Sequence, residues 1–251
     1  MKIVTWNCNG ALRNKLKEIE SLKADVLIIQ ECEDPARSSL EYKEWAGNYL
    51  WLGKDKNKGI GVFTKSENTL EKLNWSGVFG LDRLCSLSKS TSWRTADLEF
   101  FLPFRLNNSY TVLACWTKGA DSQVFGYMGQ FWKYLQIHRV DLHNPHTIIA
   151  GDFNSNTIWD KEDRWWNHSD TVNELSAINI ESLYHHQMNE KQGQETQPTF
   201  FLQRNISKPY HIDYIFVSSD LLSVSHLDIG NENEWLSVSD HMPLSLIIKR
   251  H

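Results

Sequence analysis

Acidic or amide residues stand at the ends of several apolar, strand-like runs of this sequence, and this pattern constrains the fold more than any other feature. The clearest cases are Asn7 after residues 3–6, Glu31 after 26–30 and Asp152 just beyond 147–150. Short apolar runs bounded by polar residues are typical of buried strands. In open α/β sheets, ligand sites collect beyond the carboxyl ends of such strands. The sequence therefore predicts an α/β protein with a polar site at one edge of its sheets.

The chain opens with an expected strand–helix–strand unit. Residues 2–7 indicate a strand and residues 25–30 a second, buried strand. Between them, Leu12, Leu16 and Ile19 recur at helical spacing. This order favours a βαβ start.

Strand-like runs continue along the rest of the chain. They are expected at 58–63, 93–101, 110–116, 146–152, 199–202, 211–217 and 244–248. The middle of the chain has few helix signals, so its strands are expected to be largely antiparallel. No linker rich in Gly, Ser or Pro divides the sequence, and residues 1–251 are interpreted as one domain.

Two helices are expected in the second half. The longer one is placed over residues 121–140, where apolar residues recur on one face, namely Val124, Met128, Phe131 and Leu135. For the other helix, Ser169 or Asp170 is the expected N-cap, and the helix is expected to end near Ile178.

Composition and charge exclude several classes of protein. With 41% hydrophobic and 23% charged residues, the chain is neither disordered nor a membrane protein, and no apolar run reaches the roughly 20 residues of a membrane span. The balance of 26 basic and 31 acidic residues gives −5, so any phosphate-binding patch must be local. We expect no secretory signal, because the first residues resemble a strand, and the four cysteines lack C-x-x-C spacing. We expect a cytoplasmic protein with reduced thiols, a Cys8–Cys32 disulfide being the less favoured alternative.

Three of the polar residues offer oxygen ligands to a hard cation. The carboxylates of Glu31 and Asp240 and the amide oxygen of Asn7 suit Mg²⁺ or Mn²⁺. No His/Cys cluster suggests zinc; the adjacent pair His185 and His186 stands in what reads as a polar loop. The predicted cofactor is therefore Mg²⁺ or Mn²⁺.

Other polar residues have the chemistry of phosphoryl transfer. Asp152 could orient and deprotonate a water. Asn154 and His241 could donate hydrogen bonds to oxygens that gain charge in the transition state. Each residue also has a plain structural interpretation as a turn or cap, and it is their number at strand ends that favours a site.

Five motifs in order resemble the endonuclease/exonuclease/phosphatase superfamily, which includes exonuclease III, the apurinic/apyrimidinic endonucleases and deoxyribonuclease I. They are Met-Lys-Ile-Val-Thr-Trp-Asn-Cys-Asn-Gly (1–10), Ile-Gln-Glu-Cys (29–32), Gly-Asp-Phe-Asn-Ser-Asn (151–156), His-Ile-Asp-Tyr-Ile-Phe (211–216) and Ser-Asp-His-Met-Pro (239–243). Each motif is weak alone, but together they span nearly the whole chain. The resemblance implies a four-layer α/β sandwich, with two mixed β-sheets packed face to face and helices outside.

The resemblance also implies roles for the motif residues. Asn7 and Glu31 match the metal ligands of the family, and Asp240 matches a carboxylate at or beside the metal. Asp152 matches the residue that activates water, and Asn154 a phosphate contact. Asp213 matches the carboxylate that orients the motif histidine, here His241; the residue chemistry alone does not pair these two.

The sequence departs from the family between the second and third motifs. Nucleases of the family usually place a Tyr or His against the scissile phosphate there, whereas this chain has Trp116-Thr117-Lys118-Gly119. Trp116 offers one N–H donor and Lys118 a cation, so both are candidate substrate contacts, with a solvated loop lysine as the alternative for Lys118. The segment also lacks the apurinic endonuclease pattern, which puts abasic-site cleavage in doubt.

Two further groups are candidate substrate contacts. Trp159, Trp165 and Trp166 follow the third motif and could stack on unpaired bases, although core packing is the commoner role of tryptophan. The lysines at 54, 56 and 58 could contact a nucleic-acid backbone or form a solvated hairpin tip.

These observations predict a monomeric, Mg²⁺- or Mn²⁺-dependent phosphodiesterase, a nuclease that acts on DNA in preference to RNA. One alternative keeps the chemistry and changes the substrate to an inositol phosphate, a phospholipid head group or a nucleotide. A binding module without catalysis is the other alternative, and the presence of Glu31, Asp152 and His241 argues against it.

Overall fold

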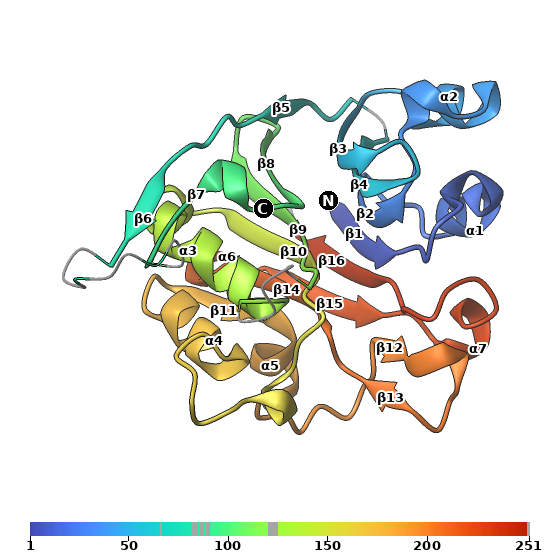
Figure 1. Ribbon diagram of the computed structural model, residues 1–251. Helices are drawn as coiled ribbons and strands as arrows, with labels where there is room; N and C mark the ends of the chain where they lie inside the picture. The colour runs from blue at the N-terminus through green and yellow to red at the C-terminus, as the bar shows by residue number, and fades with distance from the viewer. Residues whose placement is uncertain (66, 82–84, 86–87, 89–90, 120–124, 250–251) are drawn as a thin grey trace.

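Two six-stranded sheets face each other in the computed structural model, which describes all residues except 66, 82–84, 86–87, 89–90, 120–124 and 250–251 (Figure 1). The first sheet has the order β15-β16-β1-β2-β4-β3 and the second the order β11-β14-β10-β9-β8-β5. Each sheet is mixed: β1 pairs with β2 in parallel, β9 pairs with β10 in parallel, and the other neighbours are antiparallel.

The strands of the first sheet are β1 (Lys2–Asn7), β2 (Val26–Cys32), β3 (Tyr49–Asp55), β4 (Lys58–Thr64), β15 (Ser225–Ile229) and β16 (Leu244–Ile248). Those of the second are β5 (Leu70–Lys72), β8 (Phe101–Leu106), β9 (Tyr110–Trp116), β10 (Thr147–Asp152), β11 (Ile180–Ser182) and β14 (Asp213–Ser218). Two small ribbons pair β6 (Val78–Gly80) with β7 (Ser92–Arg94) and β12 (Phe200–Phe201) with β13 (Pro209–Tyr210).

Helices lie on the outer faces of both sheets (Figure 1). The α-helices are α1 (Leu16–Ser21), α2 (Leu40–Ala46), α3 (Met128–Leu142), α4 (His168–Ser176), α5 (Leu183–Met188), α6 (Ser219–Leu222) and α7 (Glu232–Trp235). Short 3₁₀ helices are η1 (Leu12–Asn14), η2 (Pro35–Arg37), η4 (Thr95–Asp97), η5 (Thr157–Trp159) and η6 (Leu202–Arg204).

Apolar clusters among the described residues hold these layers together. Between the sheets, Ile28 and Val62 of the first sheet share a buried cluster with Ala150 and Ile215 of the second. On the outer faces, α1, α2 and α7 cover the first sheet, and α3 and α4 cover the second. Burial of apolar area is the main stabilising term in such layers. The four-layer α/β sandwich expected from the sequence is confirmed.

Several expected elements have their predicted bounds. The strands at 2–7 and 110–116 are β1 and β9, and the strand at 244–248 is β16. The βαβ start is also confirmed, because β1 and β2 are parallel neighbours with η1 and α1 between them.

Two expected elements are wrong. Residues 93–101 do not form one strand: the Arg94 and Asp97 side chains and backbones form a capping box that turns the chain into η4. The long helix starts at Met128, not at 121, because Tyr127 has a φ of 51°; residues 121–124 lie outside the described part.

Smaller differences concern a cap and a loop. Asn167, and neither Ser169 nor Asp170, is the N-cap of α4, with Asp170 completing its capping box. His185 and His186 lie in α5 and not in a loop.

The structure also bears on the expectations about membrane spans and disulfides. No helix in the described residues is long and apolar enough to cross a membrane. All four cysteines are free thiols, so Cys8 and Cys32 do not form a disulfide.

Candidate active site

The alternation of side chains along three strands aims polar groups into the space between the sheets. On β10, Asp152 shares the face of Ile148 and Ala150, which pack between the sheets. Asn7 shares one face of β1 with Ile3, and Asp213 shares one face of β14 with Ile215. Since successive side chains of a strand point to opposite faces, all three project inward where the apolar core ends.

Asp152 is the centre of this group. Its Oδ2 accepts hydrogen bonds from Nδ2 of Asn7 and Nδ2 of Asn154, each at 2.9 Å, and its Oδ1 accepts one from the Asn154 backbone at 2.9 Å. The bond to Asn7 joins the two sheets. Asp152 has no exposed surface, and Asn154 adopts a left-handed φ of 46°, which returns its amide to the carboxylate.

Gly151 lets the Asp152 strand end approach its neighbour. A Cβ at this position would lie 1.9 Å from the carbonyl oxygen of Cys115 on β9. Only glycine is compatible with that separation, so the Gly-Asp pair of the third motif is required by the packing of β10 on β9.

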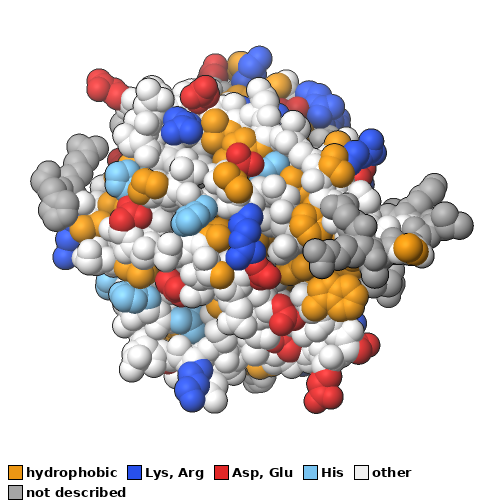
Figure 2. Space-filling model, turned by 90° about the vertical axis from the view of Figure 1, so that its left-hand side faces the viewer, with side chains coloured by type: hydrophobic (Ala, Val, Ile, Leu, Met, Phe, Trp, Pro, Cys, Tyr) orange, Lys and Arg blue, Asp and Glu red, His pale blue; other side chains and the backbone are white. Residues whose placement is uncertain are grey.

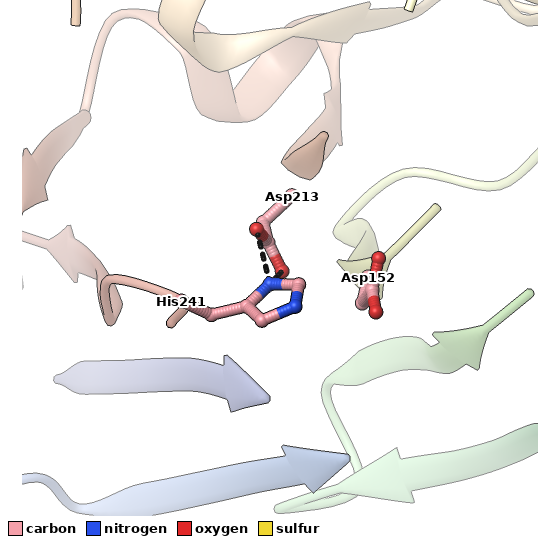
Figure 3. A group of neighbouring side chains, drawn as sticks. All are labelled: Asp152, Asp213 and His241. Carbon is pink, nitrogen blue, oxygen red and sulfur yellow. Dashed lines mark hydrogen bonds and ion pairs between the residues drawn. The ribbon is translucent and has the colours of Figure 1, made fainter. Parts of the chain in front are cut away.

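His241 and Asp213 form a buried pair beside Asp152. Nδ1 of His241 lies 2.9 Å from Oδ2 of Asp213, and the other ring nitrogen faces Asp152 (Figure 3). One side-chain oxygen or nitrogen from each of the three residues lies within 4.8 Å of the others. Asp213 and Asp152 are also partners in the β10–β14 register, so two carboxylates face one imidazole.

Burial and charge set the protonation of this trio. Burial raises the pKa of Asp152, and the charge of Asp213 raises it further, while His241 acts in the opposite direction. Burial alone would lower the pKa of His241, but the charges of Asp213 and Asp152 outweigh it and raise that pKa. The imidazole is therefore held as a cation between two carboxyl groups.

Residues that the sequence interpretation missed hold His241 in place. The Trp6 indole donates a hydrogen bond to the His241 carbonyl oxygen at 2.9 Å. Ser239 accepts one from the His241 backbone at 3.1 Å and donates one to the carbonyl oxygen of Asn7 at 2.8 Å. Thr199 accepts a hydrogen bond from the Asp213 backbone at 3.0 Å. Trp6 and Ser239 belong to the motifs recognised in the sequence, which could have identified them as part of the site. No sequence feature identified Thr199.

Glu31 reaches the site through a β-bulge. On β2, Ile28 faces the space between the sheets, and regular alternation would turn Glu31 to the outer face. The register with β4 shifts between Gln30 and Cys32, and Glu31 has a φ of 61°. The extra residue re-aims the carboxylate, as bulges commonly do. Its Oε1 then lies 3.4 Å from Nδ2 of Asn7.

The chemistry of Glu31, Asn7 and Asp152 fits a hard divalent cation. Nδ2 of Asn7 donates hydrogen bonds to both carboxylates, so three side chains that carry the oxygen ligands preferred by Mg²⁺ and Mn²⁺ meet at one place. Oδ1 of Asn7 accepts a hydrogen bond from the Asn9 backbone at 2.9 Å, so the amide would have to turn to bind an ion. The Lys58 ammonium forms an ion pair with Glu31, which shows that this carboxylate already attracts a cation. Cys8 and Cys32 are buried, and burial raises the pKa of both thiols, so no thiolate competes.

Asp240 lies beside this group without joining its closest contacts. It is half-buried, and its charge acts on Lys15 and His241. In the part of the chain that the structure describes, the three-residue acid and histidine cluster comprises Asp152, Asp213 and His241, not Asp240.

The two candidate substrate contacts at the end of β9, Trp116 and Lys118, differ in exposure. Trp116 is only 3% exposed and packs on Phe100 with ring centroids 4.7 Å apart, so its indole has no surface for a substrate. The prediction that Trp116 contacts substrate is corrected on this ground. Lys118 is exposed, and its Nζ lies 4.5 Å from the centre of the Trp116 ring. Trp116 therefore supports the lysine.

The three tryptophans after the third motif differ in exposure. Trp159 and Trp165 are 46% and 55% exposed, whereas Trp166 is 8% exposed and packs on Phe125. Trp159 and Trp166 line the same cavity as Asn154; Trp165 lies at an edge of Trp166 and does not line that cavity.

Two of the three lysines at 54, 56 and 58 form ion pairs with acidic residues. Lys54 forms an ion pair with Glu99, and Lys58 with Glu31. Figure 2 shows basic side chains scattered among acidic and hydrophobic ones on the face it presents, rather than gathered into one field. Any contact to a polyanion on that face is therefore local.

A family model described as the Endonuclease/Exonuclease/phosphatase family matches residues 4–241. The chain belongs to this family. The match runs from β1 to His241, so it includes three of the five motifs completely and most of the first and fifth, which confirms the resemblance.

Solved structures share the fold of this family member. A 3′–5′ exonuclease (NExo) from Neisseria meningitidis is 18% identical with a TM-score of 0.70, and the alignment covers 100% of both chains. A structure of the 3′ phosphatase NExo from Neisseria bound to a product DNA hairpin is 17% identical with a TM-score of 0.70, again over 100% of both chains. An AP endonuclease from Archaeoglobus fulgidus is 18% identical with a TM-score of 0.63, over 100% of both chains. No curated protein sequence matches the chain.

Proposed function

We propose that this protein is a divalent-metal-dependent phosphodiesterase that hydrolyses DNA. One observation carries the proposal: the buried Asp152 carboxylate is held by the amides of Asn7 and Asn154 and faced by the His241–Asp213 pair. A buried carboxylate with a raised pKa is a suitable general base near neutral pH. Membership of the family and the nuclease titles of its structural neighbours support the same reaction.

In the proposed reaction Asp152 takes a proton from a water as the water oxygen bonds to phosphorus, and the bond from phosphorus to the leaving ester oxygen breaks. Asn154 and the His241 imidazolium donate hydrogen bonds to phosphate oxygens that gain charge. Asp213 binds Nδ1–H of His241 and so directs the other nitrogen toward Asp152. In the structure both amides lie on Asp152, so substrate would have to draw at least one of them away.

Glu31 and the Asn7 oxygen, with Asp240 beside them, are the proposed ligands of Mg²⁺ or Mn²⁺. A bound divalent ion would neutralise phosphate charge and stabilise the leaving oxygen. The Lys58 ammonium occupies Glu31 in the structure and would have to give way to the ion.

Exposed groups around Asp152 support a polymeric substrate. Lys118 and Trp159 lie on different elements that approach Asn154: the Asn154 amide donates to the carbonyl oxygen of Thr117 at 3.1 Å, next to Lys118, and Trp159 lines the Asn154 cavity. A DNA strand bound at Asp152 could contact both groups at once. Trp165, further out on the same segment as Trp159, stays a candidate contact for a longer strand.

The test measures cleavage of a labelled oligonucleotide by the wild-type protein and by Asp152→Asn. The Asn variant keeps the shape of Asp152 and removes the base, so turnover should fall by roughly 10²–10⁴ while binding persists. Chelation should abolish the wild-type activity, and Mg²⁺ or Mn²⁺ should restore it. Circular dichroism controls for folding.

Two results would contradict the proposal. Near-wild-type turnover by Asp152→Asn would mean that another group activates the water. Efficient release of phosphate from an inositol phosphate or nucleotide, without any oligonucleotide cleavage, would favour the alternative of a phosphatase with a small substrate.

A further inference from the structure

A cavity of about 390 Å³ adjoins the proposed catalytic group, and apart from Asn154 its lining takes no part in the chemical step described above. It lies between residues 126–129 at the start of α3 and residues 154–168, and it shares Asn154 with the Asp152 site. Its size falls within the range of ligand pockets, roughly 300–1,000 Å³. We call it the Trp159 pocket, after the exposed tryptophan in its lining.

Aromatic side chains form the walls of the Trp159 pocket. Trp166 is a fixed wall, packed on Phe125 with ring centroids 4.3 Å apart. Gly129 permits its approach, since a Cβ there would lie 2.9 Å from Cδ1 of the indole. Trp159 is 46% exposed and is held against Tyr210 with ring centroids 5.4 Å apart. Two indoles therefore face one space, with one of them accessible for stacking.

Most polar side chains in the lining already have partners within the protein. The two carboxylate oxygens of Asp160 accept hydrogen bonds from the backbones of His168 and Ser169. Asn167 caps α4, and the His168 ring bonds Ser155 and Gln192. Burial lowers the pKa of His168 to about 4, so this ring is neutral at pH 7.

Arg164 is the exception among these polar groups. Its ion pair with Asp163 spans 3.8 Å, and the Asp163 side chain is 82% exposed. Such surface pairs contribute little free energy, so the guanidinium can be released to an anion. The Trp159 pocket thus combines stacking surfaces with one available cation, which is the chemistry of a nucleotide site.

We propose that the Trp159 pocket binds the base of an unpaired nucleotide next to the scissile phosphate, with Arg164 on a neighbouring phosphate. A base still paired in a duplex cannot enter a pocket walled by two indoles, so the proposal makes single-stranded or frayed DNA the substrate class. It rests on the proposed function, because it takes the position of the scissile phosphate from Asp152.

The test measures binding in the Asp152→Asn background with Ca²⁺, by fluorescence anisotropy. The wild-type protein first maps the bond that is cleaved in a single-stranded oligonucleotide. Two further oligonucleotides then carry an abasic tetrahydrofuran in place of the base on one or the other side of that bond. Removing one of these bases should weaken binding by about tenfold or more.

Trp159→Ala should weaken binding of the intact oligonucleotide by a similar factor and leave the affinity for the base-free one unchanged. Trp159→Phe keeps an aromatic ring and should restore most of the affinity. Ile158→Ala is the matched control, because Ile158 is an exposed neighbour in the same η5 helix that does not line the pocket. A hairpin that pairs the critical base should bind more weakly than the same sequence with that base unpaired.

Equal affinity for intact and base-free oligonucleotides would overturn the proposal, as would an equal loss for both on Trp159→Ala. Failure of the proposed function has a different signature, since the wild-type protein with Mn²⁺ would then cleave no bond at all. In that case binding is measured with a dinucleoside monophosphate and its two base-free analogues. A Trp159-dependent loss of affinity on base removal would still support base binding in the Trp159 pocket. Unchanged affinity would contradict it.

Discussion

Nδ1 of His241 lies 2.9 Å from Oδ2 of Asp213, and both side chains are buried where the two sheets end. The two residues are 28 positions apart in the sequence, and the Phe200 ring packs on His241 with the ring centres 4.6 Å apart. A buried imidazolium is stable only beside an anion, so Asp213 fixes both the charge and the direction of His241.

Asp213→Asn should therefore lower turnover by roughly 10²–10⁴, because an amide neither stabilises the imidazolium nor fixes which ring nitrogen carries the proton. The pKa of His241, raised by Asp213 against the effect of burial, should fall. Steady-state kinetics measures the first effect, and an NMR titration of the His241 ring measures the second. Asp228→Asn breaks the comparable pair with His226 on the exposed surface and should change neither. A turnover loss without a fall in the His241 pKa would contradict the assigned role.

The residues brought together at the site were predictable because their strands have simple alternation. Asn7, Asp152 and Asp213 each continue the inward parity of the apolar residues in their strand, and the motifs marked them. Glu31 was identified by its motif alone, since its position depends on a bulge that periodicity cannot reveal.

The errors have different causes, and only some of them lie beyond what sequence patterns show. Trp116 stands at a strand end, but it shares the parity of Val112 and Ala114, so it joins the core. The start of α3 depends on the left-handed backbone of Tyr127, which apolar spacing on the helix face does not encode. The Trp159 pocket needs segments that only the tertiary fold brings together.

The ion pair between Lys58 and Glu31 predicts the direction of two changes in metal affinity. Glu31→Gln removes the charge of a proposed ligand and should weaken Mn²⁺ binding by at least about tenfold. Mutating a residue that only supports a metal ligand already lowers metal affinity by about tenfold or more. Lys58→Met removes a competing cation and should strengthen binding, by up to about fivefold for so exposed a pair. Calorimetric titration with Mn²⁺ reads both, with Lys249→Met as a distant control. Unchanged affinity in Glu31→Gln would place the ion elsewhere.

His168 predicts a loss of stability in mild acid. It is buried between Ser155 and Gln192, and burial lowers its pKa to about 4, against about 6.5 in an unfolded chain. Between these values the unfolded state binds the extra proton, so the free energy of unfolding should fall as pH drops from 6.5 to 4, by about 3 kcal/mol. Above pH 6.5 His168 contributes no pH dependence.

Urea unfolding across that pH range measures the effect. His168→Gln should be less stable at pH 7 but should lose less stability on acidification than the wild type. His226→Gln, at an exposed histidine, should keep the wild-type slope. Equal slopes for wild type and His168→Gln would mean that His168 titrates normally.

Lys118 and Lys133 predict how binding of DNA depends on salt. Both line a cavity of about 310 Å³, and their ammonium groups lie over aromatic rings, Lys118 at 4.5 Å from Trp116 and Lys133 at 4.2 Å from Phe125. Among the described ion pairs neither lysine has a carboxylate within 4.0 Å, although the charge of Asp97 acts on Lys133, whereas Lys54 and Lys58 each form an ion pair. They are thus the better candidates for phosphate contacts.

The affinity of the Asp152→Asn protein for a single-stranded oligonucleotide, with Ca²⁺ present, should fall steeply with salt. Each phosphate neutralised contributes about −0.7 to the log–log slope, so about three contacts give a slope near −2. Lys118→Glu and Lys133→Glu should each flatten the slope by at least about 0.7. Lys249→Glu makes the same charge change beyond the far end of β16 and should leave it unchanged. Anisotropy titrations across a salt series give these slopes. A flat dependence, together with rapid turnover of a small phosphate ester, would show that the site holds one phosphate group and not a DNA strand.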